Sequence, residues 1–161
     1  MGSDPAALAP LAARIEAHYR AVAAGPMADV PLCNPRLAVR LVRLVDWAGV
    51  RVGVLVMPWA INLILLPGRD PWPAAASLSK RRWRFPSGDY DFVFGEDVGF
   101  GPYQVCSLFS PALEFDSMAA ACETAGAALL ALLQPPIAAD AAPPDDASPS
   151  RRRWLFGRHA A

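Results

Sequence analysis

Six short segments of strand-like composition, all between residues 37 and 109, limit this chain to folds built around a sheet. They are rich in β-branched and aromatic residues, and the residues between them are of the kinds that form turns. The first segment is ambiguous, because Arg40 and Arg43 are three apart and also suit a helix; its β-branched content and the turn signal at 46–49 favour a strand. The predicted strands cover residues 37–45, 50–56, 60–66, 80–85, 89–94 and 103–109.

Two helices are predicted on either side of this block. Residues 5–24 carry apolar side chains at helical spacing, with Pro10 expected in the first turn and the regular part starting near Ala9. Residues 116–133 form the second helix, with Asp116 or Ser117 as its N-cap. Strands grouped between helices predict an α+β fold, in which a mostly antiparallel β-sheet packs with an N-terminal and a C-terminal helix.

Composition divides the 161 residues into an N-terminal helix packing on the core (1–29), an α+β domain (30–134) and a disordered Pro, Ala and Asp-rich linker with a basic tail (135–161). Fifteen basic side chains balance fifteen acidic ones, which gives no reason to expect nucleic acid as a partner. We find no secretory signal, and no apolar stretch reaches the roughly 20 residues of a membrane span. We therefore expect a cytoplasmic protein without direct membrane insertion.

The motifs of common catalytic and metal sites are missing from the sequence. It contains no G-x-G-x-x-G, no Walker phosphate loop and no C-x-x-C, so we expect no cofactor and no metal. We interpret His18, on the first predicted helix, as an interfacial or surface residue. Cys106 is either a buried small hydrophobe or the nucleophile of a cysteine-dependent enzyme. Because nothing combines a nucleophile, a base and an oxyanion site, we predict that the protein is not an enzyme.

Charged residues gather in the predicted hairpin over residues 80–97. The basic run at 80–84 faces the acidic residues Asp89, Asp91, Glu96 and Asp97. One interpretation is cross-strand charge pairing on a solvated hairpin. The other is a surface on which Glu96 and Asp97 recognise arginines of a partner.

Aromatic side chains lie near prolines and glycines at the predicted strand ends. Trp59, Trp72 and Tyr103 are typical of binding clefts, although core packing at loop bases explains them equally well. Asn34 and Asn62 are polar residues in apolar surroundings, where a buried amide must be hydrogen-bonded. We expect Asn62 to fix a loop or an extended peptide.

Several short strings occur in a fixed order along the chain. They are Cys33-Asn34-Pro35, 53–59 (GVLVMPW), 62–68 (NLILLPG), Trp72-Pro73, 85–88 (FPSG), Gly101-Pro102-Tyr103 and 106–111 (CSLFSP). Their order and spacing resemble the HybE/HupJ family of nickel-iron hydrogenase assembly chaperones. The resemblance covers about residues 30–133 and rests on the strings together, since each alone is weak.

The resemblance implies a non-catalytic maturation chaperone for a membrane-bound, exported uptake hydrogenase. Its partner would be the precursor of the hydrogenase small subunit, held by its twin-arginine signal peptide before export. The alternative is a scaffold that binds the large subunit or other maturation proteins. Some family members carry a rubredoxin domain, but the lack of C-x-x-C pairs means that this activity is not carried over.

The C-terminal tail contains a motif of its own at residues 150–155. Arg151, Arg152, Trp154 and Leu155 follow the pattern of a twin-arginine signal, although no apolar stretch comes after them. The motif is either a basic, solvated tail or a mimic of the client that occupies the client's groove.

Overall fold

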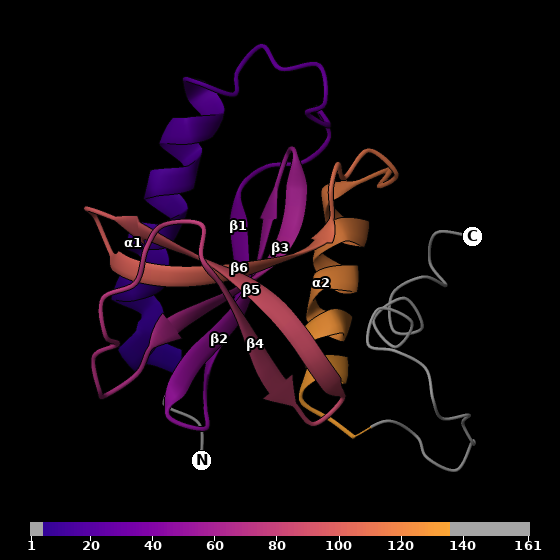
Figure 1. Cartoon of the computed structure of the whole chain (residues 1–161). Coiled ribbons are helices and arrows are strands. Elements are labelled where there is room, and N and C mark those ends of the chain that lie inside the picture. The colour runs from indigo at the N-terminus through magenta and orange to yellow at the C-terminus, as the bar shows by residue number, and fades with distance from the viewer. Residues whose placement is uncertain (1–4, 136–161) are drawn as a thin grey trace.

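The computed structural model describes residues 5–135, which form two helices and one six-stranded sheet (Figure 1). All neighbouring strands are antiparallel, in the order β1-β2-β3-β6-β5-β4. This confirms the predicted α+β fold. The elements are α1 (Pro5–Ala24), β1 (Arg40–Trp47), β2 (Val50–Met57), β3 (Ala60–Pro67), β4 (Lys80–Phe85), β5 (Gly88–Asp97), β6 (Gly101–Phe109) and α2 (Met118–Leu132).

The helices lie on opposite faces of the first half of the sheet (Figure 1). On one face, Ile15 of α1 packs with Leu55 and Ile64. On the other, Leu129 of α2 packs with Val54. We call these the α1-side and α2-side faces. With both faces covered, β2 and β3 are buried along almost their whole length, which explains their continuous apolar sequence.

The second half of the sheet, β4 to β6, is open on its α1 side. Because α1 packs mainly on β1, it reaches these strands chiefly at the tip of the β5–β6 hairpin. In β5 the residues that face α2, such as Tyr90 and Phe92, are buried, whereas Asp91 between them is exposed. Successive side chains of a strand point to opposite faces, so this alternation marks one covered and one open face.

Several predicted element ends differ from the structure. β5 continues to Asp97 rather than residue 94, and β6 begins at Gly101 rather than residue 103. β1 starts and ends later than the predicted 37–45, because the turn after it contains only Ala48 and Gly49, whose φ values of 49° and 85° suit a tight hairpin. Pro10 lies inside α1 rather than in its first turn, since the helix already begins at Pro5. Of the two predicted N-cap candidates of α2, Ser117 is confirmed, because its side chain accepts a hydrogen bond from Ala120 N.

Two sequence predictions lie partly or wholly beyond the described residues. The disordered linker and the tail motif at 150–155 fall there, and the three-part division of the chain stays a prediction. Among the described helices, none combines the length and the apolar character needed to cross a membrane.

Candidate functional site

Four of the six predicted contact residues lie on the α1-side face. Trp59, in the turn between β2 and β3, is half-buried against the cluster under α1. Asn62 lies on the same face of β3 and pairs with Ser107 of β6. Asp97 and Tyr103 come together at the other end, where the tip of the β5–β6 hairpin meets α1.

The other two predicted residues are elsewhere. Trp72, in the loop between β3 and β4, packs on the α2-side face beside Trp83, with ring centroids 6.3 Å apart. Glu96 is exposed, and strand alternation points it away from the face that Asp97 occupies. The six residues therefore do not line one continuous groove.

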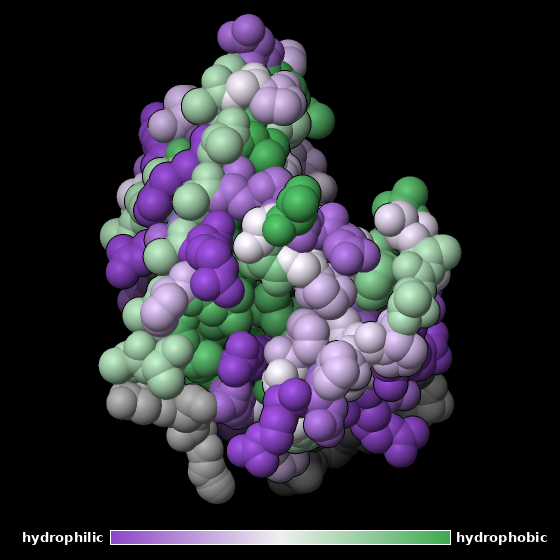
Figure 2. Space-filling view, turned by 90° about the vertical axis from the view of Figure 1, so that its left-hand side faces the viewer, coloured by the Kyte–Doolittle hydropathy of each residue, from purple (hydrophilic) through white to green (hydrophobic). Residues whose placement is uncertain are grey.

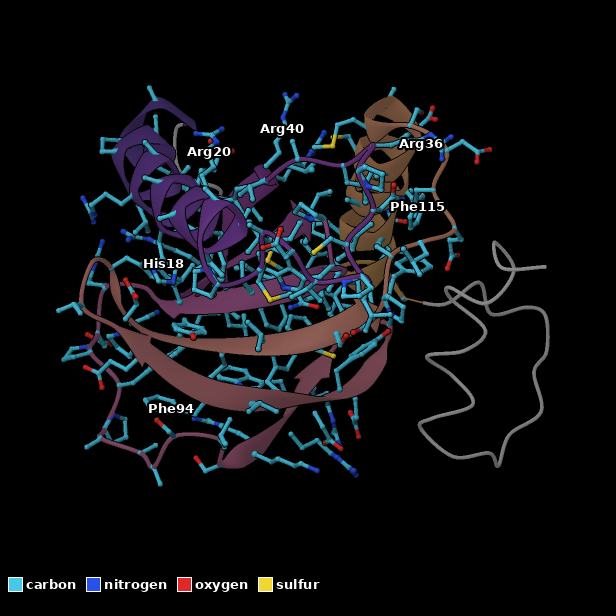
Figure 3. All side chains as sticks on the ribbon, turned by 90° about the horizontal axis from the view of Figure 1, so that it is seen from above. His18, Arg20, Arg36, Arg40, Phe94 and Phe115 are labelled. Carbon is cyan, nitrogen blue, oxygen red and sulfur yellow. The ribbon has the colours of Figure 1, made fainter. Side chains whose placement is uncertain are left out.

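Five side chains join the β5–β6 tip to α1, and we call them the tip cluster: His18, Tyr19, Asp97, Phe100 and Tyr103. His18, on the side of α1 that faces the strands (Figure 3), has its Nδ1 3.0 Å from Asp97 Oδ1. Phe100 lies between the rings of His18 and Tyr103, with centroids 5.6 and 5.4 Å away. Burial, then Tyr103 and Asp97, raises the pKa of Tyr19 above its usual range, so its hydroxyl stays protonated at neutral pH.

Two features support the tip cluster: the absence of a side chain at Gly95, and hydrogen bonds that the Asp97 carboxylate makes within the chain. Tyr103 lies over Gly95, where a Cβ would come 2.6 Å from Tyr103 Cζ. Asp97 Oδ2 accepts a hydrogen bond from Gly99 N at 2.7 Å. Both oxygens of Asp97 thus have a partner within the chain, whereas the exposed Glu96 makes no ion pair with another described residue. Figure 2 views the molecule from the side on which α1 lies in Figure 1. It shows a hollow of hydrophobic residues with hydrophilic residues around it.

Asn34 and Asn62 share one sequence signal but differ in structure. Asn34 is buried and donates from Nδ2 to the backbone oxygens of Ala112 and Phe115, at 3.0 and 2.9 Å. Its Oδ1 accepts from Arg36 N at 3.0 Å. Asn62 Oδ1 is inaccessible to solvent and has no hydrogen-bond partner among the described residues. The prediction of a satisfied buried amide is confirmed for Asn34 and wrong for the Asn62 oxygen.

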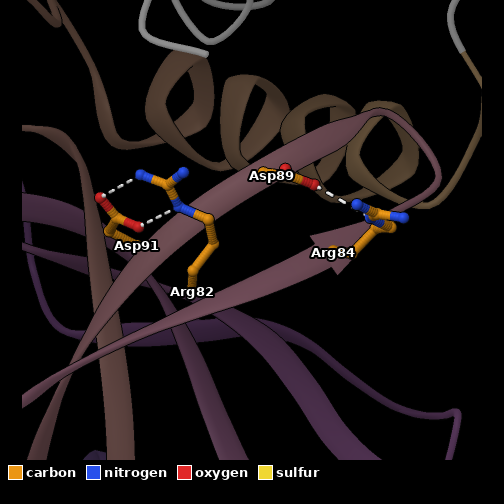
Figure 4. Close-up of polar contacts among 4 residues, drawn as sticks. All are labelled: Arg82, Arg84, Asp89 and Asp91. Atoms are coloured by element: carbon orange, nitrogen blue, oxygen red, sulfur yellow. Dashed lines mark hydrogen bonds and ion pairs between the residues drawn. The ribbon is translucent and has the colours of Figure 1, made fainter.

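The acidic residues of β5 pair across the hairpin. Arg82 Nε lies 2.9 Å from Asp91 Oδ1, and Arg84 Nε lies 3.4 Å from Asp89 Oδ1 (Figure 4). The hydrogen bond to Asp91 raises the pKa of Arg82. Cross-strand pairing is therefore the interpretation that holds for Asp89 and Asp91, which leaves Glu96 and Asp97 as the candidates for arginine recognition.

Sequence reasoning missed Gln104, which is only 4% exposed. Its Oε1 accepts a hydrogen bond from Trp83 Nε1 at 2.9 Å, and it lines a cavity together with Trp72. Alternation along β6 already places Gln104 on the buried face with Cys106, so a polar residue at an apolar position was the available signal.

The cysteines fit the structural interpretation. Cys106 is 2% exposed within the α2-side core, as expected for a small hydrophobe. Cys33 and Cys122 are half-buried, and neither forms a disulfide. In the described part of the chain, no three His, Cys, Asp or Glu side chains gather as a metal site would need.

Known proteins are similar to this chain in fold and in sequence. The solution structure of HybE from Escherichia coli matches with a TM-score of 0.65 at 24% identity, covering 85% of each chain, which identifies the fold. HoxT of Azotobacter vinelandii, a hydrogenase expression/formation protein, is 40% identical and is matched over 89% of this chain and 92% of its own. HoxT of Cupriavidus necator is 37% identical over 89% and 87% of the two chains.

The family model described as "NiFe-hydrogenase assembly, chaperone, HybE" matches residues 10–157. The chain belongs to this family of hydrogenase assembly chaperones.

Proposed function

We propose that this protein holds a nickel-iron hydrogenase precursor in the cytoplasm before export, by binding the small subunit through its twin-arginine signal peptide. Family membership carries the proposal as far as hydrogenase assembly. The hydrogenase is the partner, and the chaperone acts by binding rather than by catalysis.

The α1-side face supports the finer part of the proposal. A twin-arginine signal presents two guanidinium groups and then an apolar stretch, so a receptor needs carboxylates beside an apolar surface. Asp97 is the carboxylate on this face, at the tip of the β5–β6 hairpin. Exposed Glu96 adds a second carboxylate at the edge of the tip, where it makes no ion pair with another described residue. The rings of Phe100 and Tyr103 belong to the same tip cluster as Asp97, and Trp59 and Asn62 follow on the same face.

Calorimetric titration of the full chain with the isolated signal peptide tests this proposal. We expect binding, and about tenfold weaker binding when both arginines of the peptide are lysines, because the bidentate guanidinium contact is lost. Glu96→Ala should weaken binding, whereas Glu123→Ala, an exposed carboxylate on α2, should not. Unchanged affinity in a Glu96→Ala/Asp97→Ala variant would show that the arginine contact is wrong.

Co-purification distinguishes the two candidate subunits. If the chain captures the large subunit but not the signal-bearing small subunit, the scaffold alternative replaces the signal-peptide proposal.

The tail motif extends the same proposal. Arg151, Arg152, Trp154 and Leu155 would compete with the client as a tethered mimic, at an effective concentration on the order of mM. Deleting residues 150–161 should therefore tighten signal-peptide binding. Unchanged affinity would show that the tail is only a basic, solvated segment.

A further inference from the structure

The Asp97 carboxylate, on which the proposed function relies, already has partners within the chain. His18 Nδ1 lies 3.0 Å from Asp97 Oδ1, and Gly99 N donates to Oδ2 at 2.7 Å. An ionised carboxylate only accepts hydrogen bonds, so His18 Nδ1 carries a proton and donates it. Only 14% of the Asp97 side chain is exposed, which leaves little room for a second donor beside the imidazole. A client arginine and His18 therefore compete for Oδ1.

A guanidinium can replace the imidazole in the contacts that His18 makes. The His18 ring lies beside Phe100, with centroids 5.6 Å apart. A guanidinium is also planar and also interacts with aromatic rings, and it donates two parallel hydrogen bonds to a carboxylate where Nδ1 donates one. Each carboxylate oxygen accepts two hydrogen bonds, so Gly99 N can keep its bond to Asp97. Arginine is therefore the stronger of the two competitors.

His18 also lies in the loosely packed half of α1. The first half of the helix buries three large apolar side chains, which are Leu8, Leu11 and Ile15. In the second half, residues 16–24, no residue is buried. The tip cluster and a hydrogen bond from Leu41 N to Glu16 Oε2, at 2.8 Å, join this half to the strands. Residues 25–39, which follow, form neither helix nor strand and can accommodate a shift of this half.

We propose that His18 is an internal placeholder for a client arginine. The arginine replaces His18 at Asp97 and Phe100, and the second half of α1 then detaches from the β5–β6 tip. Without a client, His18 keeps a poorly exposed carboxylate paired and so avoids the cost of leaving it without a partner. The inference rests on the proposed signal-peptide function and adds the residue that gates it.

Calorimetric titration of the full chain with the signal peptide tests the exchange through two opposite changes at one position. His18→Ala removes the competing donor, so the peptide should bind about three- to tenfold more tightly. His18→Arg supplies a guanidinium from within the chain, so binding should become about tenfold weaker. Misfolding of a variant does not explain tighter binding.

Amide hydrogen exchange, with and without the peptide, reports the movement of α1. Amides of residues 18–24 should exchange faster when the peptide is bound, while those of residues 11–15 keep their protection. Unchanged exchange over 18–24 in a chain that has bound the peptide would overturn the proposed detachment.

Ala17→Arg is the matched control, because Ala17 is exposed on α1 next to His18. It adds the same charge to the helix away from Asp97 and should leave the affinity nearly unchanged at physiological salt. Equal weakening by Ala17→Arg and His18→Arg would mean general charge repulsion and would overturn the inference. Unchanged affinity in His18→Ala, in a wild-type chain that binds the peptide, would overturn it while the signal-peptide proposal stands. No binding by either chain would overturn both.

Discussion

The two halves of the sheet differ in how much of them the helices cover. β2 and β3 are buried on both faces between α1 and α2. β4 is exposed at most positions, and β5 alternates between buried and open residues. All the candidate contact residues except Trp59 and Asn62 lie in the second half or in the loop that leads to it.

We link the covered half of the sheet to the stability of the fold, and the partly open half to the proposed recognition of a partner. Fully buried apolar strands supply most of the hydrophobic free energy of folding. Strands with one open face can carry charged and aromatic side chains without a large loss of stability, because those side chains remain partly solvated. The predictions below test this separation, beginning with the largest expected effect.

Shortening one valine in each half gives the most direct test. Val54 of β2 is fully buried, and Val54→Ala should cost about 2–4 kcal/mol of unfolding free energy through lost burial and a residual cavity. Val93 of β5 is only half-buried, so Val93→Ala should cost less than about 1 kcal/mol. Urea denaturation of both variants measures the difference. Equal losses of unfolding free energy in the two variants would contradict this division between the two halves of the sheet.

The two asparagines should also differ. Asn34→Ala removes partners from the buried backbone oxygens of Ala112 and Phe115 and should cost about 2–3 kcal/mol. Asn62→Ala removes a buried oxygen that has no hydrogen-bond partner among the described residues, and should leave the denaturation midpoint nearly unchanged. A large loss at Asn62 would reveal that its amide supports the fold after all.

Substitutions at Gly53 and Gly95 should show a smaller difference in stability. A Cβ at Gly53 would collide with the backbone oxygen of Arg43 beside the register shift in β1, so Gly53→Ala should cost about 1–3 kcal/mol. At Gly95 the colliding group is the Tyr103 side chain, which can rotate away. Gly95→Ala should therefore change the near-ultraviolet circular dichroism of the tyrosines more than the melting temperature. Comparable melting-temperature losses would show that the β5–β6 tip is as rigid as β2.

The ion pairs Arg82–Asp91 and Arg84–Asp89 on the open face should contribute least to the free energy of unfolding. Arg84 is 86% exposed in its pair with Asp89, and such surface pairs are weak and screened by salt. Arg84→Ala should leave the urea midpoint unchanged within error at physiological salt. A clear destabilisation that persists at high salt would argue for a structural role of these ion pairs.

The sequence was informative where local rules decide the structure. Alternation and turn residues located all six strands, and helical spacing located both helices. It was uninformative where distant segments meet. The partners of Asn34 lie 78 and 81 positions away, so nothing local distinguished it from Asn62. Likewise, the grouping of His18 with Asp97 follows from the packing of α1 against a hairpin far along the chain.

The strand order also has a consequence for the newly made chain. β4 and β5 join the rest of the sheet only through β6, which pairs Ser107 with Asn62 of β3. While a ribosome has produced only α1 to β3, Asp97 and Tyr103 have not yet been synthesised. We therefore expect a nascent chain to lack the tip cluster until β6 has left the ribosome exit tunnel and docked on β3.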